Sequence, residues 1–227
     1  MTEIAKRIAQ VRERIEAACR RSGRAAGSVR LLAVSKTKPL SDMQEAYDAG
    51  CREFGENYVQ EILEKDGQLP PDAKLHMIGH LQTNKVGKIV GRVAEIHSVD
   101  SVRLAKEIEK QASKREIPEV KVLLEVNVAK EETKFGFQCE EVAEALSEIH
   151  AACPHVNVQG LMTSAPITEE PETNRVYFRK LRELAEKNGL SELSMGMTDD
   201  FEVAVEEGAT IVRVGTAIFG PRSYARQ

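Results

Sequence analysis

The stretch LLAVSKTKP, residues 31–39, begins with apolar residues, continues into Ser35 and Lys36 and stops at Pro39. A short apolar run that ends in polar residues and proline is typical of a strand buried on both faces, as in a parallel sheet. Similar runs recur along the chain, separated by charged stretches with helical character. We therefore interpret residues 31–35 as the first strand of a repeating strand–helix pattern.

Eight such units can be counted, and their alternation predicts parallel strands joined by helical crossovers. Eight units suit a closed (β/α)8 TIM barrel, and an open doubly wound sheet is the alternative. Helices are predicted at residues 101–115 and 172–189, the second ending at a glycine. The predicted strands are LLAVS (31–35), EFGEN (53–57), LHMIG (75–79), EIHSV (95–99), VKVLLEVN (120–127), VQGLMT (158–163), ELSMG (192–196) and TIVRVG (210–215).

An additional helix is predicted before the barrel. Apolar residues recur at helical spacing near the N-terminus, and Gly23 is expected to end the helix. The segment is charged throughout, so it has the character of neither a signal peptide nor a membrane span. The residues of the apolar face are Ile4, Ile8, Val11 and Ile15.

The composition favours one globular unit. The chain has 227 residues, 41% of them hydrophobic, which predicts a single barrel domain over residues 1–227. The net charge of -4 lacks the basic character of a nucleic-acid-binding protein. Four widely spaced cysteines with no C-x-x-C pair predict reduced thiols and a cytoplasmic location.

In a barrel of this kind the chemistry lies at the carboxyl ends of the strands. The loops after the seventh and eighth strands carry glycine beside hydroxyl residues, in SMGMT (194–198) and RVGT (213–216). Backbone N–H groups and hydroxyls in such loops can bind a phosphate. The alternative interpretation is that both are ordinary strand-to-helix turns, which favour the same residues.

Lys36 follows a continuously apolar strand, where partial desolvation favours the neutral amine. A neutral amine can form an imine with an aldehyde, and together with a phosphate site this suggests pyridoxal phosphate. Two alternatives remain at this point. Lys36 is a surface lysine, or it forms an imine with the substrate of an aldolase-type enzyme.

Other motifs give weaker signals. His76 and His80 have the spacing of a helical metal pair, but Gly79 favours a strand end, so a metal site is not expected there. His97, His150 and His155 receive no assignment. The sequence has no Walker A motif, no G-x-G-x-x-G and no G-x-S-x-G.

The longer motifs closely resemble the YggS/PROSC family of pyridoxal phosphate homeostasis proteins, and the resemblance covers nearly the whole chain. It implies a barrel similar to the N-terminal domain of alanine racemase and to bacterial-type ornithine decarboxylases (fold type III), without their second β domain. The motifs are LLAVSKTKP, FGENYVQE (54–61), HMIGHLQTNK (76–85), FGF (135–137), GLMTSAP (160–166) and LSMGMTDDFEVAVEEGATIVRVGTAIFG (193–220).

Carried over by motif, the resemblance implies that Lys36 forms a covalent aldimine with pyridoxal phosphate and that Arg213 faces the pyridine nitrogen. Asn57 and the IGHLQ loop would line one face of the ring, and Met162 and Ser164 the other. The role of His80 stays open. The phosphate would be held by Ser194, Gly196, Thr198, Gly215 and Thr216.

The resemblance also implies a protein that holds and delivers pyridoxal phosphate to apoenzymes and acts in its homeostasis, rather than a clear catalyst. A charged Arg213 opposes protonation of the ring nitrogen and so weakens the electron sink. A small amino-acid racemase or related α-carbon enzyme is the alternative, but none of the tyrosines (Tyr47, Tyr58, Tyr177, Tyr224) falls in a motif that would place it as the second base. A monomer without membrane or nucleic-acid partners is expected.

Overall fold

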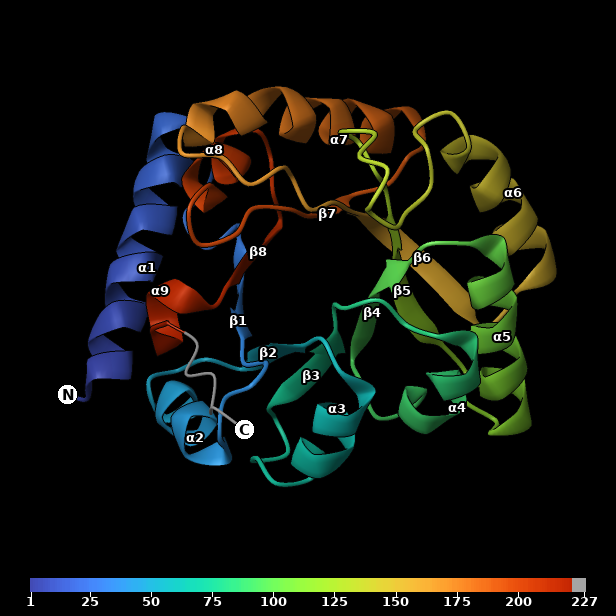
Figure 1. Cartoon of the computed structure of the whole chain (residues 1–227), viewed down its shortest axis with the longest axis horizontal. Coiled ribbons are helices and arrows are strands. Elements are labelled where there is room, and N and C mark those ends of the chain that lie inside the picture. The colour runs from blue at the N-terminus through green and yellow to red at the C-terminus, as the bar shows by residue number, and fades with distance from the viewer. Residues whose placement is uncertain (222–227) are drawn as a thin grey trace.

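Eight parallel strands form a closed barrel in the order β1 to β8, with the helices around its outside (Figure 1). The structure is a computed structural model and describes residues 1–221. The barrel closes where β1 pairs with β8, from Arg30 opposite Ile211 to Ala33 opposite Val214. The predicted (β/α)8 barrel is confirmed, and the open sheet is excluded because β1 pairs with both β2 and β8.

The elements alternate along the chain as the sequence predicts. The strands are β1 (Arg30–Val34), β2 (Glu53–Glu56), β3 (Lys74–Met77), β4 (Glu95–Val99), β5 (Val120–Glu125), β6 (Val156–Met162), β7 (Glu192–Ser194) and β8 (Ile211–Val214). The helices are α1 (Glu3–Arg21), α2 (Leu40–Asp48), α3 (Val59–Lys65), α4 (Val86–Ile89), α5 (Val102–Lys114), α6 (Val142–Ala152), α7 (Arg175–Lys187), α8 (Phe201–Glu206) and α9 (Thr216–Phe219), with 3-10 turns η1 (Thr83–Lys85) and η2 (Pro171–Asn174).

All eight predicted strands are present, but most end before the predicted boundary. Ser35, Asn57 and Gly79, for example, lie beyond β1, β2 and β3. These residues have left the sheet to form loops, which places them at the mouth of the barrel. The helix predicted at 172–189 starts later, at Arg175, and the 3-10 turn η2 precedes it.

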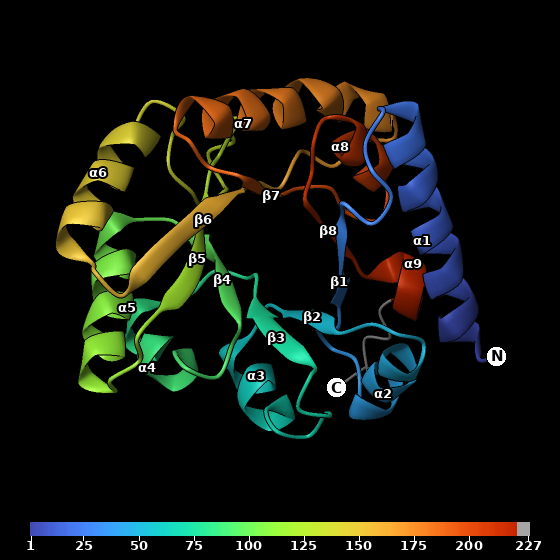
Figure 2. The ribbon, with the colours of Figure 1, turned by 180° about the vertical axis from the view of Figure 1, so that it is seen from behind.

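The predicted N-terminal helix is α1, which packs on the outside of the barrel against α2, α8 and α9 (Figures 1 and 2). Its buried face includes Ile4, Ile8, Val11 and Ile15, as the sequence predicts. The Thr2 hydroxyl caps the helix by accepting a hydrogen bond from the backbone N–H of Ala5. Gly23 follows the helix with a φ of 70°, a conformation that glycine adopts without steric cost.

Two hydrophobic clusters hold the fold together. The larger one fills the layer between the strands and the surrounding helices. The smaller one lies inside the barrel, where Leu32, Leu123, Met162 and Ile211 pack together. This apolar plug leaves polar side chains toward the two mouths of the barrel.

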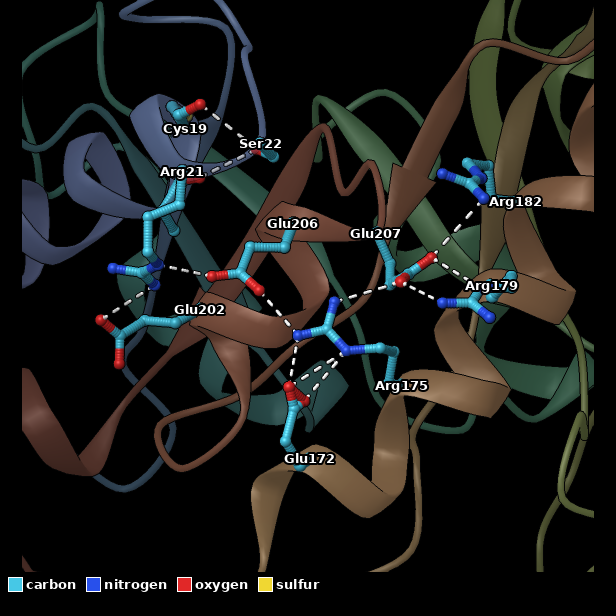
Figure 3. A network of polar contacts seen from close by, with 11 residues as sticks. Cys19, Arg21, Ser22, Glu172, Arg175, Arg179, Arg182, Glu202, Glu206 and Glu207 are labelled. Atoms are coloured by element: carbon cyan, nitrogen blue, oxygen red, sulfur yellow. Dashed lines mark hydrogen bonds and ion pairs between the residues drawn. The ribbon is translucent and has the colours of Figure 1, made fainter.

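A network of ion pairs connects α1, α7 and α8 on the outer surface (Figure 3). Arg175 contacts Glu172, Glu206 and Glu207, and Arg21 joins Glu206 from the side of α1. Glu207 is buried whereas Glu172 is exposed, so the network combines surface pairs, which contribute little to stability, with a pair that is shielded from water. In residues 1–221 no helix has both the length and the apolar character needed to span a membrane.

Candidate functional site

A cleft of about 340 Å³ opens at the carboxyl-end mouth of the barrel. Its volume lies within the range of small-ligand pockets. Seven of the predicted site residues line it: Lys36, Asn57, Ser164, Thr198, Arg213, Gly215 and Thr216. The structure therefore brings together residues from strand ends that are far apart in the sequence. Ile78, from the predicted IGHLQ loop, also lines the cleft, and further lining residues that were not predicted are Val34, Lys38, Ile167, Met197, Asp199 and Gly220.

Lys36 lies in a loop whose backbone is firmly held. The next residue, Thr37, has a φ of 63°, a left-handed conformation that is uncommon for a residue other than glycine and costs of order 1–3 kcal/mol. Its backbone N–H donates to Glu61 Oε2 at 2.8 Å. This charge-assisted hydrogen bond stabilises the strained turn immediately after the lysine.

A buried ion cluster holds the other side of the same turn. Lys65 Nζ, from the end of α3, donates to the Ser35 carbonyl at 3.0 Å, to Glu56 Oε1 at 2.9 Å and to Glu61 Oε2 at 2.6 Å. The Ser35 hydroxyl also donates to Glu56 Oε1, at 2.5 Å. Burial raises the pKa of Glu56 to about 7, against the opposing effect of Lys65. Both neighbours of Lys36 are thus positioned by one cluster.

Arg213 is buried and extends from β8 toward the cleft. Its Nη1 donates to the Ser194 carbonyl at 2.7 Å and to Ser194 Oγ at 2.9 Å, and its Nη2 donates to the Thr163 carbonyl at 2.8 Å. A longer bond of 3.3 Å reaches Ser164 Oγ. Desolvation lowers the pKa of Arg213 to about 10, so the guanidinium remains cationic at neutral pH. These contacts fix its plane in one orientation.

The loops after β7 and β8 meet at one end of the cleft. Thr198 Oγ1 accepts from the backbone N–H of Ala217 at 3.4 Å, which joins the two loops. Asp200 supports the first loop by accepting from the Met197 N–H at 2.7 Å and from Asn174 Nδ2 at 2.8 Å. At the start of α9 the Ala217 N–H is therefore taken by Thr198, and the Ile218 N–H donates to the Gly215 carbonyl at 2.9 Å.

Three further predicted site residues, Met162, Ser194 and Gly196, are not among the residues that line the cleft. Met162 belongs to the apolar plug, and Ser194 contacts Arg213 and, at 3.0 Å, His97 Nδ1. Gly196 has a φ of 90°, and a Cβ there would lie 2.5 Å from the Cβ of Ala204. Its carbonyl accepts from the Arg213 N–H at 2.9 Å.

The IGHLQ loop divides between two hollows. Ile78 lines the cleft, whereas His80 lines a neighbouring hollow with Asp100 and Phe135. The His80 ring stacks on Phe135 with 3.8 Å between centroids, and its Nδ1 lies 3.1 Å from Asp100 Oδ2. His76, by contrast, is buried near the opposite mouth. The two histidines therefore line different hollows.

Sequence reasoning missed the residues that support the turn around Lys36. Lys65 sits among charged residues on a helix, where an exposed position is the usual expectation. The spacing of Glu61 and Lys65 as an i,i+4 pair was visible, but such pairs are usually solvated. Their burial depends on where α3 packs, which local sequence does not show.

The fold and cleft define a class of protein: a parallel barrel with a cleft lined by a lysine after β1, a buried arginine on β8 and hydroxyl-rich loops after β7 and β8. Residues 8–223 match the family model described as alanine racemase, N-terminal domain. A pyridoxal phosphate homeostasis protein from Aquifex aeolicus (strain VF5) is 50% identical over 226 residues, covering 96% of this chain and 98% of that protein. This chain belongs to the family of pyridoxal phosphate homeostasis proteins.

Solved structures agree with this assignment. PipY of Synechococcus elongatus PCC7942, with pyridoxal phosphate bound, superposes with a TM-score of 0.82 at 36% identity, covering 96% of this chain and all of that one (100%). Alanine racemase from Corynebacterium glutamicum superposes with a TM-score of 0.72 at 19% identity, over 98% of this chain and 64% of that one. The second likeness shows the shared barrel fold.

Proposed function

We propose that the protein holds pyridoxal phosphate covalently on Lys36 and releases it to other proteins, as part of pyridoxal phosphate homeostasis. The observation that carries the proposal is the single cleft that joins Lys36, Arg213 and the loops after β7 and β8. Loss of one water between the Lys36 amine and the cofactor aldehyde gives an imine. Return of water, or attack by an incoming amine, releases the cofactor.

The chemistry of the cleft fits this group. A lysine lies at one strand end, and donors suited to a phosphate lie on the loops that carry Thr198, Gly215 and Thr216. Apolar side chains of Val34, Ile78 and Met197 complete the walls, as an aromatic ring requires. The bound group supplies an aldehyde for imine exchange, and the chain supplies the amine, the anion site and the orientation.

We assign Arg213 to the pyridine nitrogen, and Asn57 and Ser164 to positions along the ring. A guanidinium cannot accept a proton and stays charged, so it opposes a protonated ring nitrogen. Ser194 and Gly196 then act by supporting Arg213 and the turn beneath the phosphate. Met162 contributes to the apolar plug inside the barrel.

Two features favour storage and transfer over chemistry at the α-carbon. Arg213 weakens the electron sink that racemisation needs. Of the tyrosines in residues 1–221, neither Tyr47, Tyr58 nor Tyr177 lines the cleft, and Tyr224 lies outside the described residues. An α-carbon enzyme would exchange the α-proton of an amino acid with solvent deuterium, and we expect no such exchange above the rate of free pyridoxal phosphate.

The test is near-ultraviolet and visible absorbance of the wild type and of Lys36→Ala, before and after borohydride reduction. We expect an imine band in the wild type that disappears on reduction and is absent from Lys36→Ala. Lys38→Ala is the matched control, because Lys38 also lines the cleft but donates to the carbonyls of Phe219 and Pro221. Mass spectrometry of the reduced wild type should place the added group on Lys36.

A protein that stays colourless with added pyridoxal phosphate would refute the proposal. Retention of the imine band in Lys36→Ala would refute the assignment of the lysine alone. We also propose that the chain acts as a monomer in the cytoplasm and passes the cofactor to apoenzymes. The four free cysteines, three of them buried, support a reducing compartment. Size-exclusion chromatography with light scattering tests the monomer.

A further inference from the structure

Three side chains of metal-binding type meet at the mouth of the barrel opposite Lys36. His76 lies on β3, and Glu95 and His97 lie two residues apart on β4, so the alternation of a strand turns both toward the same face. The two strands pair with His76 opposite Glu95. All three residues are buried. From the sequence, His97 received no assignment, and His76 was considered as a metal ligand only together with His80.

The three potential ligand atoms form a nearly regular triangle. His97 Nε2 lies 3.0 Å from Glu95 Oε2, His76 Nδ1 lies 3.2 Å from His97 Nε2, and His76 Nδ1 lies 3.5 Å from Glu95 Oε2. Ligand atoms around a tetrahedral Zn²⁺ ion, with bonds of 2.0–2.1 Å, are separated by about 3.3–3.4 Å. The triangle can therefore accept such an ion with shifts of a few tenths of an ångström.

An independent observation at His76 also points to a ligand. Its side chain is buried, with 1% of its surface exposed, and Nε2 has no hydrogen-bond partner in the described part of the chain. With Nδ1 bound to a metal, Nε2 carries the ring proton and faces Glu53 Oε2, 3.9 Å away. A carboxylate behind a metal-bound histidine is the usual outer partner of such a ligand.

His97 has a partner of the same kind. Its Nδ1 lies 3.0 Å from Ser194 Oγ, so Nε2 is available to a metal when Nδ1 carries the proton. Coordination thus moves the ring proton of His97 within the ring and releases none. Ser194 Oγ then accepts from both His97 and Arg213, which would connect this cluster to the cleft at the other mouth.

The cluster is accessible from solvent. A cavity of about 450 Å³ opens at this mouth, with His76 and Glu95 in its wall, and four lining carboxylates outnumber three lining cations. Arg30 is the competing charge, with Nη2 3.6 Å from Glu95 Oε2. The same guanidinium is also held by Glu192 at 3.0 Å and by Glu53 at 3.4 Å, so it keeps partners when Glu95 turns to a metal.

We propose that His76 Nδ1, Glu95 Oε2 and His97 Nε2 form a site for a divalent transition-metal ion, with a fourth position open to water from the cavity. Two imidazoles and one carboxylate favour Zn²⁺ among the common ions. The site is distinct from the cofactor cleft and does not depend on the function proposed for that cleft.

The experiment is calorimetric titration of Zn²⁺ into chelator-treated protein, followed by Co²⁺ substitution. We expect one Zn²⁺ per chain and the intense visible absorption of tetrahedral Co²⁺. His97→Gln and Glu95→Gln should each weaken Zn²⁺ binding by at least about 100-fold, since loss of a direct ligand exceeds the 10–100-fold effect of outer partners. Arg30→Gln should strengthen binding, because it removes a positive charge beside the ligand oxygen.

Two controls separate this site from adventitious binding. His155→Gln removes a histidine paired with Glu109 at 2.6 Å but without a second imidazole, and Cys139→Ser removes the only cysteine that is not buried. Neither should change the stoichiometry. X-ray absorption of the Zn²⁺-loaded wild type needs no variant and should show two imidazoles. A wild type that binds no Zn²⁺, or binding that survives in both ligand variants, would overturn the proposal.

Discussion

The two mouths of the barrel contain buried ionisable groups whose pKa values shift in opposite directions. At the mouth that carries Lys36, burial raises the pKa of Glu56 and of Glu125 to about 7. At the opposite mouth, burial lowers the pKa of His97 to about 4, and the histidines hold the pKa of Glu95 well below its ordinary value, against the effect of burial.

Glu95 and Glu125 differ in their partners, and this difference separates their pKa values. Glu95 has two imidazoles within 3.5 Å, and their hydrogen bonds favour its charged form. Glu125 instead has Asp100 nearby, and the opposing charges of Arg213 and Lys134 do not offset its desolvation. At neutral pH Glu56 and Glu125 at the cleft mouth are therefore partly protonated. Glu95 at the opposite mouth stays ionised, and its negative charge favours a bound cation.

The largest effect is expected where the ion cluster under Lys36 is broken. Lys65→Met leaves Glu56 and Glu61 without their shared cation, and removing one partner of a buried pair typically costs about 3–5 kcal/mol of stability. Lys106→Met is the matched control, because Lys106 is exposed and pairs with exposed Glu148. Denaturant unfolding measures both changes, and the control should lose far less stability than Lys65→Met.

This variant also tests the positioning of Lys36. If the cluster holds the turn, Lys65→Met should slow imine formation with pyridoxal phosphate, and adding Glu56→Gln should recover part of the stability. A folded Lys65→Met protein with an unchanged rate of imine formation and unchanged stability would show that the ion cluster does not hold the turn at this mouth of the barrel.

A smaller effect is expected for the turn after β7. In Gly196→Ala the new Cβ lies 2.5 Å from the Cβ of Ala204. Gly189 has a similar positive φ, 68°, but a Cβ added there has no atom within 4 Å, so Gly189→Ala is the matched control. Both variants carry the cost of a left-handed backbone, so the difference between their losses of stability measures the steric contact at residue 196, which we expect to cost about 1–3 kcal/mol. Thermal unfolding gives this difference. Gly196→Ala should also weaken pyridoxal phosphate binding, and equal stability of the two would contradict the packing described here.

Local sequence was sufficient for the barrel and for the position of several residues of the cleft. Apolar runs and their spacing fix the eight strands, and polar residues at the strand ends must then meet at one mouth. Lys36, Arg213 and Thr216 were placed at this mouth in this way, and they line the cleft. A strand-end serine predicts an accessible hydroxyl, whereas the Ser194 hydroxyl contacts Arg213 and His97.

The cluster at the other mouth could not be predicted for a related reason. Glu95 and His97 were visible as an alternating pair on one strand, but His76 joins them only through the register of β3 against β4. Register is a property of strand pairing, and the apolar pattern of one segment does not show which residue of the neighbouring strand lies opposite. The third member of such a cluster is therefore found only in the folded chain.

The smallest expected effect is a difference in the pH dependence of the two mouths. Glu125 has a pKa of about 7 in the folded protein against 4.5 as its ordinary value, so the folded state holds more protons between these values. The contribution of Glu125 to the free energy of unfolding is fully present below pH 4.5 and is lost as the pH rises through 7. His97 has a pKa of about 4 against 6.5, so its contribution is lost as the pH falls from 6.5 to 4.

Unfolding free energies of Glu125→Gln and His97→Gln, each compared with the wild type in chelator from pH 4 to 8, test this contrast. The stability of Glu125→Gln relative to the wild type should increase as the pH rises. The stability of His97→Gln relative to the wild type should increase as the pH falls. Each difference changes by at most about 1.4 kcal/mol per pH unit, the limit for one titrating group. Burial favours the uncharged form of a carboxylic acid and of an imidazole alike, so it predicts opposite slopes for the two difference curves. Two curves with the same slope would contradict the pKa directions given for Glu125 and His97.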